Sequence, residues 1–291
     1  MMEIRILETP AEMAEVEELQ RVIWPGSETE VVPLHLLITA AHNGGLALGA
    51  FIGGRMVGFV FGFPGLYEVP DGPRVKHCSH MLGVLPGLRD SGIGFALKRA
   101  QWQIIRKQGI DRITWTYDPL QSRNAHLNIA RLGAVCNTYL REVYGEMRDG
   151  LNVGLASDRF QVDWWVNTQR VERRLGRRPR GELGIDNYDS AQIPYIYRAT
   201  IGADSFVRPP EHFSIPDETM LLAEIPADFM QIRQSNFPLA VVWRIFTRQV
   251  FEECFRLGYL VTDFLYDNVS RRSFYVLTHG QATLGDFTVQ K

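Results

Sequence analysis

The segment Val84–Gly94, VLPGLRDSGIG, constrains this chain more than any other. Apolar residues precede it and a helix-compatible run, 95–108, follows it, which predicts a strand, a tight turn and a helix N-terminus. Such a turn can hold a pyrophosphate, because the first N–H groups of a helix lack intrahelical partners and carry positive potential. Gly92 and Gly94 let the backbone approach phosphates closely, and Arg89 adds a fixed positive charge. The alternative, an ordinary turn, needs neither the arginine nor the second glycine at this offset.

The order V-x-P-x-x-R-x-x-G-x-G resembles the acyl-CoA signature of the GNAT superfamily of N-acyltransferases. A dinucleotide fingerprint and a P-loop are both absent from this segment. The resemblance implies acetyl-CoA or another acyl-CoA as co-substrate and no metal. It places the cofactor on the turn and its flanks and on two amides of a later helix: Val84, Leu85, Arg89, Asp90, Ser91, Gly92, Ile93, Gly94, Phe95, Asn124 and Asn128.

Two further segments, 115–135 (WTYDPLQSRNAHLNIARLGAV) and 257–264 (LGYLVTDF), resemble a little-characterised bacterial branch of the same superfamily with an extra C-terminal domain. That branch implies a small-molecule amine or amino acid as acceptor, and either an acetyl or a succinyl donor. The sequence does not choose between these donors, and it leaves a homodimer open.

Composition excludes several other classes of protein. The 291 residues suffice for two domains, 22% are charged and the net charge is −2, which is typical of a soluble globular protein and argues against nucleic acid as a partner. The three cysteines, Cys78, Cys136 and Cys254, are far apart and lack metal-ligand spacing. Since we also find neither a signal peptide nor a membrane span, we expect a cytoplasmic protein with no membrane partner.

Hydrophobic periodicity predicts an α+β fold with alternating elements. We expect strands at 3–7, 46–52, 56–63, 77–85, 112–117, 135–140, 160–166, 220–225, 259–265 and 274–278, and helices starting at Pro10 and covering 33–42, 93–108, 122–132 and 238–257. With the resemblance, this order implies a GNAT-like mixed, mainly antiparallel central sheet flanked by helices.

The chain divides into three expected parts. Residues 1–170 form the GNAT-like acyl-CoA-binding domain, 171–181 a basic linker, and 182–291 a smaller α/β domain. The last part repeats a strand–helix–strand–strand order, which favours a degenerate GNAT-like half-repeat, although two unrelated α/β pieces would look the same. At its centre, 229–233 (FMQIR) replaces the glycine turn.

Acyl transfer from a thioester to an amine requires an oxyanion donor, a base and, for some leaving groups, an acid. By resemblance, the donor is a backbone N–H near Val84 and Leu85. His80 has a side chain suited to a base at neutral pH, although a buried neutral histidine is the plainer interpretation. Asp118 is an alternative base, although Asp118-Pro119 is equally typical of a turn.

Where the family commonly has a tyrosine that acts as the general acid for the leaving thiolate, this chain has Ile129. Tyr117, Tyr139 and Tyr144 could replace it, and of these Tyr139 is our candidate. Loss of the thiolate without an acid is the alternative.

Three functions therefore remain open at this stage. The first is an N-acyltransferase, the second a non-catalytic acyl-CoA sensor, and the third an interaction protein with a vestigial turn. The intact Arg89, Gly92 and Gly94 argue against the third function. We take the acyltransferase as the leading hypothesis and the sensor as its alternative.

Overall fold

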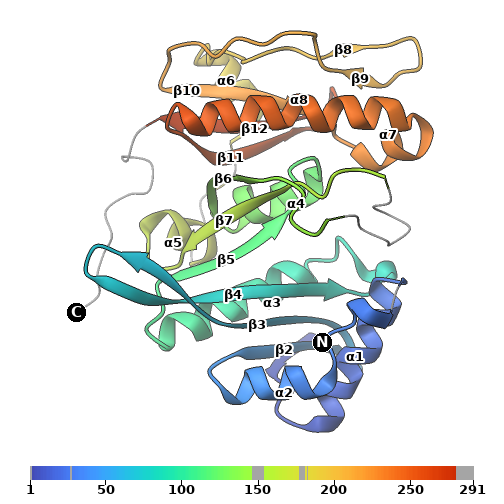
Figure 1. Ribbon diagram of the computed structural model, residues 1–291, viewed down its shortest axis with the longest axis vertical. Coiled ribbons are helices and arrows are strands. Elements are labelled where there is room, and N and C mark those ends of the chain that lie inside the picture. The colour runs from blue at the N-terminus through green and yellow to red at the C-terminus, as the bar shows by residue number, and fades with distance from the viewer. Residues whose placement is uncertain (1, 27, 146–153, 177–180, 182, 280–291) are drawn as a thin grey trace. The chain divides into compact units, whose positions relative to one another are not determined.

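The computed structural model describes residues 2–26, 28–145, 154–176, 181 and 183–279 (Figure 1). Contacts divide these residues into two compact units. The first unit comprises the described residues of Met1–Trp115 and Trp165–Asn167, and the second comprises those of Thr116–Met147, Gly154–Trp164 and Thr168–Lys291. Each unit has its own strands and helices.

The sheet of the first unit has the strand order β1-β2-β3-β4-β5. Neighbours are antiparallel except β4 and β5, which run parallel. Its strands are β1 (Met2–Ile6), β2 (Leu46–Ile52), β3 (Arg55–Val69), β4 (Gly72–Val84) and β5 (Arg112–Tyr117), the last of which ends in the second unit. Its helices are α1 (Pro10–Ile23), α2 (Leu34–His42) and α3 (Ile93–Lys107), with short 3-10 turns η1 (Glu28–Glu30) and η2 (Pro86–Leu88).

Local sequence explains the start of α1. The Thr9 side chain accepts the N–H of Glu12, and the Glu12 carboxylate accepts the N–H of Thr9, so the two residues form a capping box. Pro10 occupies the first turn, where its missing N–H costs nothing.

The helices of the first unit cover opposite faces of its sheet. Phe59 and Phe61 of β3 belong to a core cluster with residues of α1 and α2, including Met13 and Leu37. A Cβ added to Gly58 would instead lie 3.3 Å from Cγ2 of Ile93 on α3. Because successive strand residues face opposite sides, α1 and α2 lie on one face and α3 on the other.

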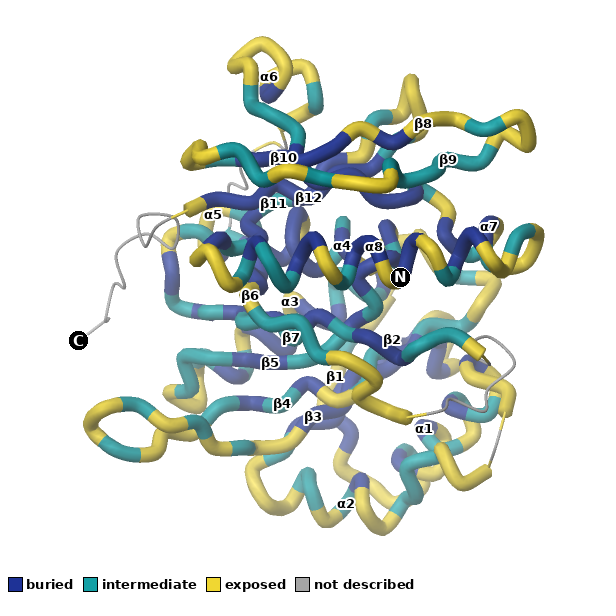
Figure 2. The backbone as a smooth tube through the Cα atoms, turned by 45° about the horizontal axis from the view of Figure 1, so that its top comes forward, coloured by how far each residue is buried: buried dark blue, intermediate teal, exposed yellow. Residues whose placement is uncertain are grey.

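Strands β3 and β4 continue as a two-stranded arm beyond their pairing with β2 and β5. Residues 65–69 pair with 72–76 in this arm, and they are exposed or half-buried (Figure 2). The sequence pattern predicts shorter strands here, because an exposed arm has no apolar face to give it a period.

The sheet of the second unit has the order β7-β6-β11-β12-β10. Its strands are β6 (Val135–Leu140), β7 (Arg159–Trp165), β10 (Met220–Ile225), β11 (Tyr259–Asp267) and β12 (Arg272–His279), with a separate ribbon of β8 (Thr200–Ile201) and β9 (Val207–Arg208). Its helical elements are α4 (Ser122–Ala125), the π-helix η3 (His126–Arg131), α5 (Gln169–Leu175), α6 (Ile185–Ser190), α7 (Phe229–Ser235) and the long α8 (Phe237–Arg256) (Figure 1).

An aromatic cluster forms the core of this second unit. The rings of Phe160 and Phe251 lie 4.8 Å apart, and those of Phe251 and Tyr275 5.2 Å apart, both edge to face. These residues come from β7, α8 and β12, so the cluster joins the long helix to two strands of the sheet.

The predicted fold class is confirmed: both units are mixed α/β with mainly antiparallel sheets and flanking helices. The expected helix 122–132 is divided into four α-helical residues and the π-helix η3. The C-terminal strand–helix–strand–strand order is present, but β12 lies between β10 and β11, whereas β4 pairs directly with β5.

The three-part domain division stays a prediction. The expected linker 171–181 begins inside α5, whose Val171 and Leu175 are buried, and its residues 177–180 lie outside the described part of the chain. Within the described residues, no helix is long and apolar enough to cross a membrane.

Candidate functional site

The turn between β4 and α3 has the geometry that its glycines predict. After η2 the chain passes through left-handed conformations at Asp90 (φ 65°) and Gly92 (φ 84°), and α3 begins at Ile93. The Ser91 hydroxyl donates to the Leu88 carbonyl at 2.6 Å and closes the turn. Gly92 is the N-cap residue of α3 and offers no side-chain cap. Gly92 itself therefore supplies no side-chain acceptor for the first N–H groups of α3.

The two glycines of the signature serve different purposes. Gly92 has a positive φ, which side-chain-bearing residues rarely adopt, and a Cβ there would meet nothing within 4 Å. Gly94 has no such backbone requirement, and its Cβ would lie 3.6 Å from Cδ2 of Leu82, an ordinary contact. Only Gly92 is thus required by the backbone of the turn. A glycine at position 94 is instead explained by the open space that the absence of a side chain leaves in front of the backbone there.

Arg89 lies on the exposed side of the turn and reaches α1. Its Nη2 donates to the carbonyl of Ile23, at the C-terminal end of α1, at 3.4 Å. A cation near a helix C-terminus is favourable, so this contact fixes the direction of the side chain.

One edge of β4 is open beside this turn. Among the described residues, β4 pairs with β5 only at His77 with Ile113 and Cys78 with Thr114. On its other side β4 stays paired with β3 as far as Val84. Residues 79–84 therefore present one backbone edge that β5 does not occupy.

The hydrogen bond of Leu85 shows which backbone groups face this edge. The Leu85 N–H donates to the Val57 carbonyl on β3 at 2.9 Å. In an antiparallel pair the hydrogen-bonding groups alternate along the strand. Those of Leu82 and Val84 therefore face away from β3, toward the open edge. Of the two donors expected from the sequence, Val84 is available and Leu85 is occupied by Val57.

A β-bulge interrupts β4 at His80. Phe61 pairs with Met81 and Gly62 with Ser79, so His80 is the extra residue. Sequence reasoning did not find the bulge, because it is a property of the pairing between two strands.

The bulge reverses the alternation of side chains along β4. Before it, Ser79 faces α3, where it binds Lys98; after it, Leu82 and Val84 face α3, beside Gly94. Met81 packs against the cluster under α1 and α2. An uninterrupted strand would put Ser79 and Met81 on the same face.

The two histidines of β4 lie on opposite faces, as their spacing predicts. His80 is exposed, and its ring lies 5.8 Å from that of Phe63 and 6.3 Å from that of Phe61. Partial desolvation lowers the pKa of His80 below its usual value, so the imidazole is neutral at pH 7 and able to accept a proton.

His77 is fully buried on the α3 face. Its Nε2 lies 3.1 Å from Nε2 of Gln101, and a Cβ at Gly62 would lie 2.3 Å from this ring nitrogen. Burial, with a smaller contribution from the charge of Lys98, lowers the pKa of His77 to about 3. His77 therefore has no role as a base at neutral pH.

The other candidate residues belong to the second unit. The Tyr139 hydroxyl donates to Oδ2 of Asp158 at 2.8 Å, and burial raises the pKa of Tyr139 above its usual range. Asn124 of α4 is exposed, whereas Asn128, in the π-helix, is buried. The two amides therefore differ in access to solvent, although α-helical spacing predicts a shared face.

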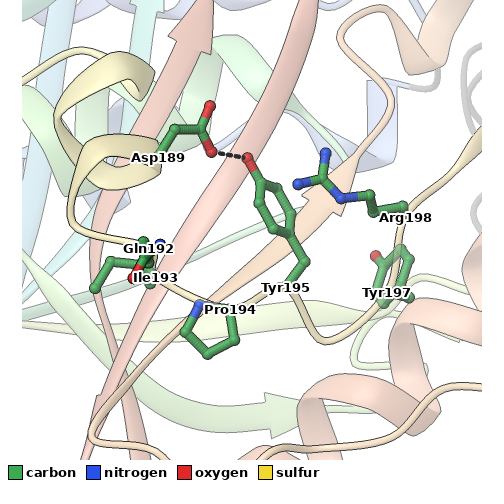
Figure 3. A pocket seen from close by; sticks show the side chains of 7 residues that line it. All are labelled: Asp189, Gln192, Ile193, Pro194, Tyr195, Tyr197 and Arg198. Carbon is green, nitrogen blue, oxygen red and sulfur yellow. Dashed lines mark hydrogen bonds between the residues drawn. The ribbon is translucent and has the colours of Figure 1, made fainter.

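A hollow of about 430 Å³ lies in the second unit (Figure 3). Tyr195 stands at its centre, with its hydroxyl donating to Asp189 at 2.8 Å and the Arg198 guanidinium 3.8 Å from its ring centroid. None of the residues that we expected to bind the cofactor lines this hollow. Within the described residues, no group of three or more His, Cys, Asp or Glu side chains could hold a metal ion.

Comparison with known proteins identifies similar folds only. No protein-family profile and no curated protein matches the sequence. Similar solved structures include a GNAT-family acetyltransferase from Streptococcus pneumoniae (17% identity, 56% of this chain, 98% of that chain, TM-score 0.43). A second is the ribosomal-protein-S18-alanine N-acetyltransferase from Escherichia coli (19% identity, 57% of this chain, 94% of that chain, TM-score 0.40). A third is Arabidopsis thaliana NAA60 in complex with a bisubstrate analogue (17% identity, 57% of this chain, 100% of that chain, TM-score 0.44).

These matches cover a little more than half of this chain.

Proposed function

We propose that this protein is an acyl-CoA-dependent N-acyltransferase. The open edge of β4, which leads into a left-handed turn and a helix whose N-cap residue is Gly92, is the observation that carries the proposal. An extended ligand with amides and a terminal pyrophosphate fits such a surface. Its amides would pair with the free edge of the strand, and its phosphates would bind the N–H groups of the turn.

The backbone of β4 also supplies the oxyanion donor in this proposal. The N–H groups of Leu82 and Val84 face the open edge, where the thioester of a bound acyl-CoA would lie. A donor that is fixed before the reaction stabilises the negative charge on the carbonyl oxygen as the amine attacks.

His80 is the proposed general base. The amine nitrogen attacks the thioester carbon, a C–N bond forms, the C–S bond breaks, and the imidazole takes the proton that the amine loses. Its position at the bulge, in the part of β4 that β5 does not pair with, supports this role. The thiolate is a tolerable leaving group. Tyr139 stays our hypothesis for the acid, to be tested by Tyr139→Phe.

The acceptor in this proposal is a small-molecule amine or an amino acid, and the donor is acetyl-CoA or succinyl-CoA. Calorimetric titration with acetyl-CoA, succinyl-CoA and CoA, followed by assays of thiol release with pooled amines and amino acids, tests the proposal. Saturable binding with amine-dependent thiol release would support it. Binding without release would instead indicate an acyl-CoA sensor.

The His80→Gln variant tests the base. We expect kcat to fall by about 10²-fold with little change in acyl-CoA affinity, because a base acts on the chemical step. The inflection of the pH–rate profile that the lowered pKa of His80 produces should disappear. An unchanged profile would exclude His80.

A further inference from the structure

Four polar side chains are buried together between β4 and α3. Lys98 Nζ donates to Ser79 Oγ at 2.7 Å and to Gln101 Oε1 at 3.2 Å, and Ser79 Oγ donates to the same amide oxygen at 3.1 Å. Gln101 and His77 complete the group through their Nε2 atoms, 3.1 Å apart. Each of the four is at most 5% exposed, so this network is part of the interior.

The donors set the direction of every hydrogen bond in this network. Because Gln101 Oε1 accepts from Lys98 and Ser79, its amide nitrogen must donate to His77 Nε2. His77 then carries its proton on Nδ1, a buried atom without a hydrogen-bond partner among the described residues. The network is therefore ordered from Lys98 toward His77.

Lys98 lies where β4 and β5 separate. Ser79 directly follows Cys78, the last residue of β4 that pairs with β5, and Trp115 directly follows Thr114, its counterpart on β5. The Lys98 nitrogen binds the Ser79 hydroxyl and lies 3.7 Å from the centroid of the Trp115 ring. Lys98 thus contacts, on each of β4 and β5, the first residue beyond the last paired position.

Ser79 also directly precedes the bulge at His80. A bulge can migrate along a strand, and a shift of one residue exchanges the groups on the two faces and edges. With the bulge in its observed place, Leu82 and Val84 present their N–H groups to the open edge. If the bulge lay beyond Val84 instead, the N–H groups of Met81 and Gly83 would face the open edge in place of those of Leu82 and Val84. The anchor at Ser79 is therefore suited to hold the bulge in place.

Stability alone does not account for a lysine at this position. Burial lowers the pKa of Lys98 well below its usual value, which means that the charged form is disfavoured here. A methionine of similar length would fill the same space without this cost. A side chain that costs stability and yet fixes a bulge is typical of a functional region.

We propose that Lys98 is a positioning residue for acyl transfer: through Ser79 and Trp115 it fixes the bulge at His80, and so aims the N–H groups of Leu82 and Val84 at the thioester. This inference rests on the proposed acyltransferase function. Lys98 itself need not touch the substrate, because it acts through the backbone of β4.

The Lys98→Met variant tests this inference, with Lys107→Met as the matched control. Lys107 lies on the same helix but is exposed in its last turn. We expect Lys98→Met to melt at or above the wild-type temperature and to bind CoA within about threefold of it, because the phosphate turn is unchanged. We expect kcat to fall by about 10- to 100-fold, since a small misplacement of a reacting group has effects of this size. Lys107→Met should match the wild type in all three.

A second variant and a second measurement separate positioning from general damage. Ser79→Ala removes the anchor without a change in packing volume and should lower kcat in the same way. Amide hydrogen exchange at residues 79–84 should become faster in Lys98→Met and stay unchanged in Lys107→Met. A kcat of Lys98→Met within about twofold of wild type would overturn the inference. So would a fall in kcat that is accompanied by a lower melting temperature and a comparable loss of CoA affinity. If the wild type transfers no acyl group, the proposed function fails, and unchanged exchange at 79–84 would then overturn the positioning role separately.

Discussion

Leu85 and Val57 are joined by a hydrogen bond of 2.9 Å from the Leu85 N–H to the Val57 carbonyl. This bond makes Leu85 part of the β3–β4 ladder. It also fixes the alternation of the preceding residues, so that the N–H of Val84 is directed away from β3. The open edge of β4 is defined by this alternation rather than by any side chain.

Replacing Val84 by proline removes the N–H that faces the open edge and no bond of the β3–β4 ladder. A proline is tolerated where the missing N–H faces away from the partner strand. We expect Val84→Pro to fold and to keep its affinity for CoA, while kcat falls by about 10²- to 10³-fold, as for the loss of one oxyanion donor. Steady-state kinetics and calorimetry check this, with Val84→Ala as the control for side-chain loss. Undiminished kcat in Val84→Pro would remove this N–H from the mechanism.

The two signature glycines should respond differently to alanine. Gly94→Ala meets only ordinary contacts with Leu82 and Val84, and alanine favours the helix, so we expect a melting temperature at or above wild type. The new methyl group should nevertheless reduce CoA affinity by about tenfold or more, because phosphates approach the backbone closely at such a turn. Gly92→Ala should cost about 1 kcal/mol of stability, because its φ is positive.

Thermal denaturation and calorimetric titration with CoA on both variants check this prediction. If Gly94→Ala bound CoA as tightly as the wild type, the turn would not be the phosphate site.

Buried His77 should make stability depend on pH in a defined window. Burial lowers its folded pKa to about 3 from 6.5, so between these values the unfolded chain binds a proton that the folded chain does not. Stability therefore rises with pH across this window, and the contribution of His77 is lost as the pH falls through it. The slope from this single group is at most about 1.4 kcal/mol per pH unit.

Urea denaturation of the wild type and of His77→Gln between pH 4 and 7 measures this slope. The variant should show a shallower dependence by up to that amount, whatever its absolute stability. Parallel curves would mean that His77 is protonated in the folded protein.

The sequence predicts the local elements of this fold well. Pro10 and the Thr9–Glu12 pair define the start of α1, and Gly92 defines the turn before α3, because each depends only on neighbouring residues. The extra residue at His80 depends instead on how β4 pairs with β3, which no local pattern specifies.

The candidate site is predictable in its backbone and less so in its side chains. One signal for the Lys98 network is present in the sequence: Lys98 and Gln101 fall among the buried positions of α3, beside Leu97 and Trp102. Two polar residues on an apolar stripe indicate a buried polar network. Their partners Ser79 and His77 lie 19 and 24 residues away, so the contacts follow only from the fold.

The second unit contains a buried ion pair whose loss should be costly. Arg244 of α8 binds Asp118 through two hydrogen bonds of 2.8 and 2.6 Å, and their side chains are 2% and 13% exposed. Arg244→Met leaves the Asp118 carboxylate without its guanidinium, with the Leu120 N–H still donating to it at 2.9 Å. We expect a loss of about 3–5 kcal/mol, as is usual when one partner of a buried pair is removed.

The matched control is Arg141→Met. Arg141 pairs with Glu252 of the same helix, but its side chain is 60% exposed, so we expect a loss of at most about 1 kcal/mol. Chemical denaturation of both variants provides the comparison. The double variant Asp118→Asn/Arg244→Met should recover part of the loss, because the remaining amide carries no buried charge. Equal losses for Arg244→Met and Arg141→Met would mean that the Asp118 carboxylate is accessible to water once its partner is removed.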